Sequence, residues 1–122
     1  MLHLPSSSSV RVISLNRDDL LARLRNIAAR LRTEHPEVIE VRLFGSLARG
    51  DQTGTSDVDV LIVLDQSGEQ DPHRRILTFL PYFDLTRGTD ILVYTRTELT
   101  QRLSDQDRFM RRIWEESIPL RE

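Results

Sequence analysis

Apolar residues recur at helical spacing in the first third of the chain. They are Leu20, Leu21, Leu24, Ile27, Ala28 and Leu31. Arginines occupy the positions between them, which predicts an amphipathic helix with one buried face. Asn16 is suited to cap the start of this helix, and Pro36 to end it.

Three later segments carry strand patterns. Residues 38–44 alternate, with Ile39, Val41 and Leu43 predicted on the buried face. Residues 57–64 end in a continuous apolar run, as expected for a strand covered on both faces. Residues 89–95 form a third predicted strand, and its other face begins with Asp90.

The remaining pattern divides the chain into a leader, one domain and a tail. Residues 1–14 include Pro5 and four consecutive serines, which favours a flexible leader with a candidate short strand near its end. Residues 15–117 form the predicted domain, and residues 118–122 a tail. Because helices and strands are mixed along the domain, we predict an α+β (mixed α/β) fold, a small mixed sheet packed against helices.

Composition narrows the possible chemistry. The chain has 122 residues and no cysteine, so disulfides, zinc thiolates and thiol catalysis are excluded. A bound metal must therefore use oxygen or imidazole ligands, and oxygen suits Mg²⁺ or Mn²⁺. All 17 basic residues are arginine, whose planar fork pairs well with phosphate and carboxylate. The absence of a long apolar run or a secretory signal favours a cytoplasmic location.

Three acidic residues are candidates for a metal site. Asp57 and Asp59 lie two apart on one predicted strand and so point to the same face. Their mutual repulsion would be relieved by a cation, and Asp90 joins them if its strand is a neighbour. A purely structural alternative is that Asp57 caps the preceding turn, Asp59 faces solvent at an edge and Asp90 is an ordinary strand-end residue.

Gly45-Ser46 is a candidate phosphate-binding turn. It lies where the first predicted strand passes directly into one turn of helix, which Gly50 is placed to end. Glycine permits close approach of backbone N–H groups to phosphate, and the serine hydroxyl adds a donor. The alternative is an ordinary glycine turn with Ser46 as a helix cap.

Taken together, these motifs resemble a known signature. Gly45-Ser46, ten intervening residues and Asp57-Val58-Asp59 strongly resemble the signature of the polymerase beta-like nucleotidyltransferase superfamily. The wider stretches 43–50 and 56–62 look like its minimal nucleotidyltransferase (MNT) branch. Asp90-Ile91-Leu92-Val93 matches the strand that carries the family's third acid. The resemblance implies the polymerase beta-like nucleotidyltransferase fold.

The resemblance also implies roles for these residues. Gly45 and Ser46 would hold the triphosphate of ATP, the expected substrate. Asp57 and Asp59 would ligate two Mg²⁺ ions (Mn²⁺ is possible), and Asp90 would bind the second ion and help to deprotonate the attacking hydroxyl. Arg49 also fits the family pattern, either as a phosphate contact or as a brace for the turn.

The sequence given after the third strand is short, so we expect it to hold no separate acceptor-binding domain. The acceptor would then be held by a partner, by a second copy of the chain or by a large substrate itself, and a homo- or hetero-oligomer is expected. Minimal members of the family resemble antitoxins that transfer AMP to a HEPN-type protein toxin. We therefore expect AMP transfer from ATP to a protein hydroxyl, with direct nucleic-acid binding not indicated. The alternatives are a non-catalytic antitoxin that binds its partner and a nucleotide-binding regulatory subunit.

Overall fold

A four-stranded mixed sheet with the strand order β3-β2-β1-β4 organises the chain. The structure, a computed structural model, describes residues 5–51, 57–85 and 88–121, and side chains only from residue 17 onward. Its elements are α1 (Pro5–Glu34), β1 (Val38–Phe44), α2 (Gly45–Arg49), β2 (Val58–Leu64), α3 (Pro72–Phe79), the 3₁₀ helix η1 (Leu80–Tyr82), β3 (Thr89–Thr95), α4 (Arg96–Ser104), α5 (Arg108–Glu116) and β4 (Ile118–Pro119). The predicted mixed α/β fold is confirmed.

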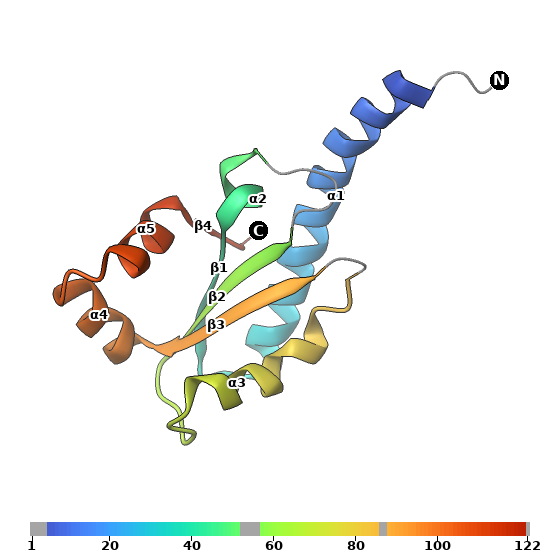
Figure 1. Cartoon of the computed structure of the whole chain (residues 1–122). Helices are drawn as coiled ribbons and strands as arrows, with labels where there is room; N and C mark the ends of the chain where they lie inside the picture. Colours follow the sequence, from blue (N-terminus) through green and yellow to red (C-terminus); the bar gives the residue numbers. More distant parts are fainter. Residues whose placement is uncertain (1–4, 52–56, 86–87, 122) are drawn as a thin grey trace.

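Strand directions bring three chain segments to one edge of the sheet. β1 runs antiparallel to β2, with Phe44 opposite Asp59. β2 runs parallel to β3, with Asp59 opposite Asp90. The end of β1 and the beginnings of β2 and β3 therefore meet at the same edge (Figure 1).

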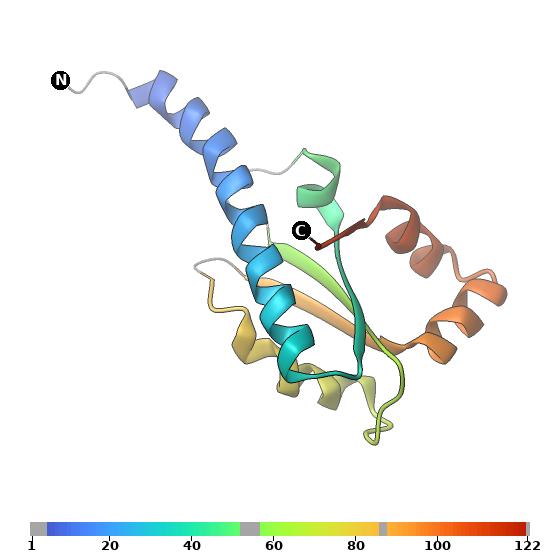
Figure 2. The ribbon, with the colours of Figure 1, turned by 180° about the vertical axis from the view of Figure 1, so that it is seen from behind.

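Helices cover both faces of the sheet. α1 and α3 bury one face, where Val58, Val60, Ile62 and Leu64 of β2 join a large apolar cluster. Leu61 and Val63 point the other way, into a smaller cluster with α4 and α5. Figure 2, which views the molecule from behind, shows α1 running across this face of the sheet. This double cover explains the continuous apolar run in β2.

The beginning of α1 differs from the predicted leader. Helix α1 starts at Pro5 and spans 30 residues, and Figure 1 shows its first turns extending beyond the sheet. Proline is well tolerated in a first helical turn, and an established helix gains one hydrogen bond for each added residue. The prediction of a flexible leader with a candidate short strand is therefore wrong from residue 5 onward. Residues 1–4 lie outside the described residues. Within the described parts of the chain, no helix is both long and apolar enough to cross a membrane.

The predicted tail also proves to be part of the fold. Ile118 and Pro119 form β4, which pairs with Leu43 and Arg42 of β1. Leu120 is fully buried, and its backbone N–H donates to the carbonyl of Val41 over 2.9 Å. A two-residue edge strand is too short to show an alternating pattern, which is why the sequence did not indicate it.

Within β1, one predicted face is shifted by a bulge. The register between β1 and β2 slips between Val38 and Glu40. Val38 is therefore buried, whereas Ile39 is 41% exposed, contrary to its predicted place in the core. Val41 and Leu43 beyond the bulge are buried as predicted. A bulge adds one residue to one strand, so alternation fails at that point.

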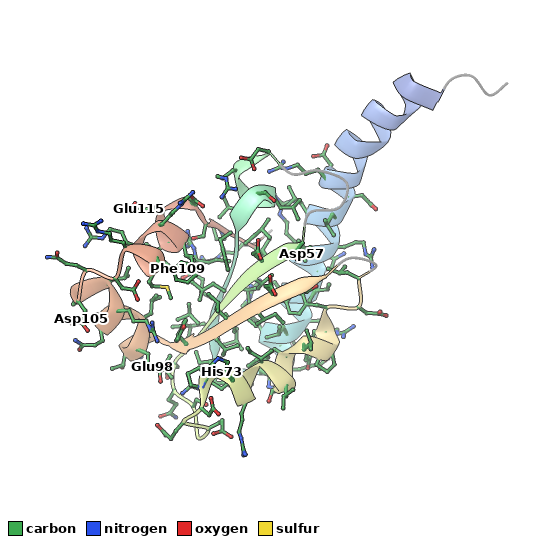
Figure 3. The ribbon with its side chains drawn as sticks, viewed as in Figure 1. Asp57, His73, Glu98, Asp105, Phe109 and Glu115 are labelled. Carbon is green, nitrogen blue, oxygen red and sulfur yellow. The ribbon has the colours of Figure 1, made fainter. Side chains whose placement is uncertain are left out.

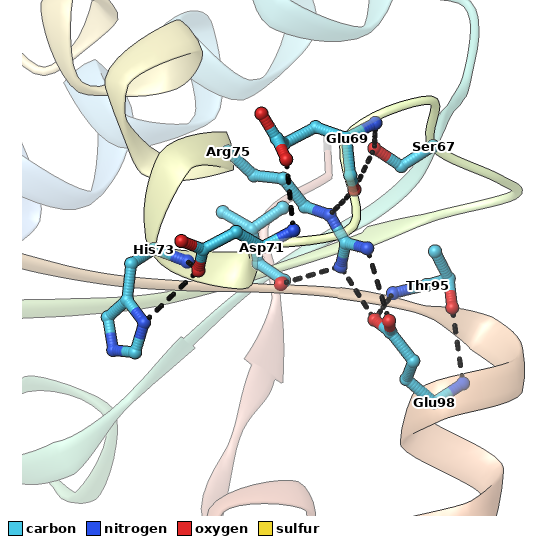
Figure 4. Close-up of polar contacts among 8 residues, drawn as sticks. Ser67, Glu69, Asp71, His73, Arg75, Thr95 and Glu98 are labelled. Atoms are coloured by element: carbon cyan, nitrogen blue, oxygen red, sulfur yellow. Dashed lines mark hydrogen bonds and ion pairs between the residues drawn. The ribbon is translucent and has the colours of Figure 1, made fainter.

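A partly buried ion pair joins α3 to α4 at the opposite end of the sheet. Arg75 is 3% exposed and donates to both carboxylate oxygens of Glu98, over 2.6 and 3.1 Å (Figure 4). Glu98 also completes a capping box with Thr95 at the start of α4. This network fixes the end of the sheet that lies away from the edge where the acidic residues meet.

The burial of Leu120 predicts a measurable contribution to stability. Leu120→Ala should lower the free energy of unfolding by about 2–4 kcal/mol, because it removes a buried side chain and leaves a cavity. Leu77→Ala is the matched control, since Leu77 is 71% exposed and should lose less than about 0.5 kcal/mol. Urea unfolding of both variants measures the difference, and equal small losses would contradict a structural role for this end of the chain.

Candidate active site

The three predicted acids come together at the edge where β1 ends. Asp59 and Asp90 are direct neighbours in the parallel register. Both lie on the face that α4 and α5 cover further along the strands, and by alternation Asp57 shares that face. Asp59 is half-buried, while Asp57 and Asp90 are exposed. Figure 3 shows Asp57 at the end of the sheet nearest α2.

Crowding of these carboxyl groups changes the acidity of Asp59. Burial, followed by the charges of Asp90 and Asp57 and a hydrogen bond shared with Asp90, raises the pKa of Asp59 to about 6. The positive charge of Arg49 opposes this rise. Asp59 and Asp90 therefore lie close together, and nearby negative charge of this kind favours the protonated form of Asp59.

Gly45 lies directly against this acidic pair. Its φ is +77°, and a Cβ atom at this position would lie only 2.2 Å from Oδ2 of Asp59. Glycine is needed here both for the left-handed backbone conformation and for the space. The predicted phosphate-binding turn and the predicted metal ligands are thus in contact.

The structure does not support Ser46 as a helix cap. Helix α2 is capped by Phe44 without a side-chain hydrogen bond, and Ser46 lies within the helix. Gly50 ends α2 with φ +84°, as predicted. The hydroxyl group of Ser46 therefore does not cap α2, as the alternative interpretation of Gly45-Ser46 required.

Arg49 takes the position of a brace. Its Nε donates to Oδ2 of Asp51 over 3.2 Å, and its Nη1 donates to Oε1 of Glu116 over 2.9 Å. The second contact joins α2 to the end of α5. Bracing is thus the role that these ion pairs display, and a phosphate contact by Arg49 stays a prediction.

Gly88 is a site residue that the sequence analysis missed. It directly precedes β3, and a Cβ atom there would lie 2.7 Å from Oδ1 of Asp57. Its carbonyl accepts from the N–H of Val58 over 2.9 Å, which holds the beginnings of the two strands together. Only the pairing of β2 with β3 places Gly88 beside Asp57, so no local motif could have identified it.

The donor set suits a hard divalent cation. Carboxylate oxygens from Asp57, Asp59 and Asp90 are the ligands that Mg²⁺ uses, together with substrate phosphates. Within 5–51, 57–85 and 88–121, however, no three acidic or histidine side chains already surround a single position. The acids therefore fit a divalent cation by the chemistry of their oxygen donors and by their location at one edge of the sheet.

Comparison with known proteins identifies the class. Residues 24–120 match the family model described as a nucleotidyltransferase domain, so the chain belongs to the nucleotidyltransferase domain family. Domains of this family generally use a nucleoside triphosphate and a divalent metal. The reaction class is therefore nucleotidyl transfer.

A solved structure supports the same fold. The chain is similar to a protein from Sulfolobus solfataricus whose crystal structure is described as that of a proposed nucleotidyltransferase. The two share 23% sequence identity with a TM-score of 0.62, over 84% of this chain and 80% of the other. Among curated proteins, none matches the sequence.

The raised pKa of Asp59 predicts how stability depends on pH. The folded protein holds this proton more tightly than the unfolded chain, so stability should fall as pH rises from about 4 to 6. A shift of about two pKa units corresponds to at most about 3 kcal/mol, and solvent screening at this partly exposed site reduces it to about 1–2 kcal/mol. Asp59→Asn should therefore raise the melting temperature at pH 7.5 by about 4–8 °C.

The same variant should gain nothing at pH 4, where Asp59 is protonated in the folded protein. Asp18→Asn, on the exposed face of α1, serves as the control and should show no such pH dependence. Thermal unfolding followed by circular dichroism, without divalent metal, makes the comparison. A gain for Asp59→Asn that is the same at both pH values would contradict the proposed charge repulsion.

The contact between Gly45 and Asp59 predicts a difference between two glycine variants. Gly45 and Gly50 both have left-handed backbones, but nothing lies within 4 Å of a Cβ at Gly50. Gly50→Ala should therefore lose only about 1 kcal/mol of stability from backbone strain. Gly45→Ala bears the same strain and must also displace the Asp59 carboxylate.

We expect Gly45→Ala to lose metal-dependent binding of ATP, while Gly50→Ala retains it. Isothermal calorimetry with Mg²⁺ measures binding, and urea unfolding measures the stability of each variant. If the two variants bind ATP equally well, Gly45 is only a turn residue.

Proposed function

We propose that this protein is an Mg²⁺-dependent adenylyltransferase that transfers AMP from ATP to a hydroxyl group on a protein partner. In this proposal it is the antitoxin of a HEPN/MNT toxin–antitoxin pair. The observation that carries the proposal is the convergence of Gly45, Asp59 and Asp90 at one edge of the sheet. The family match supports the transfer reaction, and the resemblance to minimal nucleotidyltransferases supports the choice of AMP and partner.

The nucleotide is held at Gly45 and Ser46, where β1 passes directly into α2. Gly45 exposes the backbone for close approach of the triphosphate, and the Ser46 hydroxyl donates to a phosphate oxygen. Asp57 and Asp59 face the same space and would hold two Mg²⁺ ions. When bound, these ions neutralise phosphate charge and lower the pKa of the attacking hydroxyl.

The transfer replaces one phosphorus–oxygen bond with another. The acceptor oxygen attacks the α-phosphorus of ATP, and the bond between this phosphorus and the bridging oxygen to the β-phosphate breaks. Pyrophosphate leaves with the bond's electron pair, and AMP stays on the acceptor. Asp90 is the carboxylate that receives the hydroxyl proton, since it lies beside Asp59 and is exposed to an incoming group.

An acceptor from another molecule fits the openness of this edge. Asp57 and Asp90 are both exposed, so a hydroxyl group on a partner surface can reach them. A protein that neutralised its partner by contact alone would gain nothing from the Asp59–Asp90 repulsion. A nucleotide-binding regulatory subunit would use Gly45 and Ser46 without transfer.

Transfer to the partner provides the test. The purified protein, Mg²⁺, ATP labelled on the α-phosphate and a HEPN-type protein toxin as candidate partner should yield a labelled partner. Asp57→Asn, Asp59→Asn and Asp90→Asn should each reduce the labelling at least about 10²-fold, as the loss of a single charge-stabilising group does. Chelation of the metal should abolish it.

Asp84→Asn is the matched control, because Asp84 is an exposed carboxylate outside the site and its loss should leave labelling unchanged. Full labelling by Asp57→Asn or Asp59→Asn would exclude the catalytic assignment. Metal-dependent ATP binding without labelling would favour the regulatory subunit, and partner binding without ATP binding would favour inhibition by contact alone.

A further inference from the structure

Helix α2 has too little structure of its own to hold its position. It spans only five residues, and an isolated helix of this length is unstable because nucleation is unfavourable. Leu47 is its buried residue and the one that anchors it in the core. Yet α2 begins with Gly45, whose placement against Asp59 defines the candidate site, and Ser46 follows it directly. Other parts of the chain must therefore fix α2.

Arg17 of α1 makes one such contact. Its Nε and Nη2 both donate to the backbone carbonyl of Leu47, over 3.2 and 2.9 Å. Just after α2, the N–H groups of Gly50 and Asp51 both donate to the backbone carbonyl of Ser46 and not to that of Leu47. The Leu47 carbonyl is thus one of the terminal groups that a helix leaves unsatisfied, and Arg17 supplies its partner.

The opposite side of α2 is held by α5. Glu116 accepts from Arg49 over 2.9 Å and from Arg112 over 2.8 Å. The next residue, Ser117, is buried and accepts from Nε of Arg42 on β1 over 2.6 Å. The end of α5 is therefore tied to the sheet, and α2 lies between this fixed end and Arg17.

We propose that Arg17 is a positioning residue for nucleotide binding: its guanidinium fork holds α2 so that Gly45 and Ser46 meet the triphosphate at the acidic pair. This inference rests on the proposed binding of ATP by that turn. The contact on which it rests is the one that Nε and Nη2 make with the Leu47 carbonyl, and it assigns Arg17 no contact with the nucleotide. A small displacement of α2 is expected to weaken binding strongly, since binding and catalytic groups must be held to within about 0.5 Å.

The same helix offers a matched control. Arg23 of α1 also donates to a backbone carbonyl, that of Asp84, over 3.2 Å. This contact holds the segment after η1 and does not involve α2. Arg17→Ala and Arg23→Ala therefore each remove one α1 guanidinium and its hydrogen bonding to a carbonyl, but only Arg17→Ala releases the nucleotide-binding turn.

We would measure the dissociation constant of ATP with saturating Mg²⁺ by calorimetry, together with the melting temperature of each variant. Arg17→Ala should weaken ATP binding about tenfold or more. Arg23→Ala should bind ATP like the parent at a similar melting temperature. Arg17→Lys should recover part of the affinity, because one ammonium donor can reach the Leu47 carbonyl without reproducing the fork.

The salt dependence of ATP binding separates positioning from direct contact. A positioning residue leaves the slope of affinity against salt concentration unchanged, whereas loss of a phosphate-contacting arginine reduces it. A reduced slope for Arg17→Ala, or affinity equal to that of Arg23→Ala, would overturn the inference. A parent protein that binds ATP without transferring AMP would contradict the proposed function alone, and one that binds no ATP would contradict both.

Discussion

The close approach of Asp59 and Asp90 is the constraint on which the site depends. Parallel pairing of β2 with β3 places these residues opposite each other, and burial together with the charges of Asp90 and Asp57 raises the pKa of Asp59 to about 6. The neighbouring backbone is adapted to this pair. Gly45 and Gly88 lack side chains where a Cβ atom would strike Asp59 or Asp57. Local conflicts of this kind are expected at functional sites, which agrees with the proposed role of this edge.

Stability comes from the rest of the sheet. Beyond Asp59, β2 continues as five buried apolar residues, Val60 to Leu64, which contribute to both clusters. The Arg75–Glu98 ion pair joins α3 to α4 at the opposite end of the sheet. This division lets one strand carry an unfavourable charge at its beginning while its remaining length anchors the fold. The exposed acids then lie where another molecule can reach them, which suits transfer to an external acceptor.

The arginine-only basic composition has a structural use in this fold. Arg17, Arg23 and Arg32 of α1 each donate to a backbone carbonyl on another segment. A guanidinium carries several donors in a rigid plane, so it can fasten a chain end or a short helix that has unsatisfied carbonyls. α1 is therefore hydrogen-bonded to α2, to the segment after η1 and to the residue after β4. The helix that begins at the candidate phosphate-binding turn is one of the segments held in this way.

Local patterns determined a large part of this protein. Alternation and apolar runs predicted β1, β2 and β3, and the Gly45–Gly50 spacing predicted α2, because these features depend on neighbouring residues and backbone sterics. The motif containing Asp57 and Asp59 indicated the family. Only the tertiary structure decided the bulge that exposes Ile39, the pairing of β4, the contact of Gly88 with Asp57 and the link from Arg17 to Leu47. The link joins residues 30 positions apart, and the other three depend on which strands pair and in what register, so no periodicity in the sequence records them.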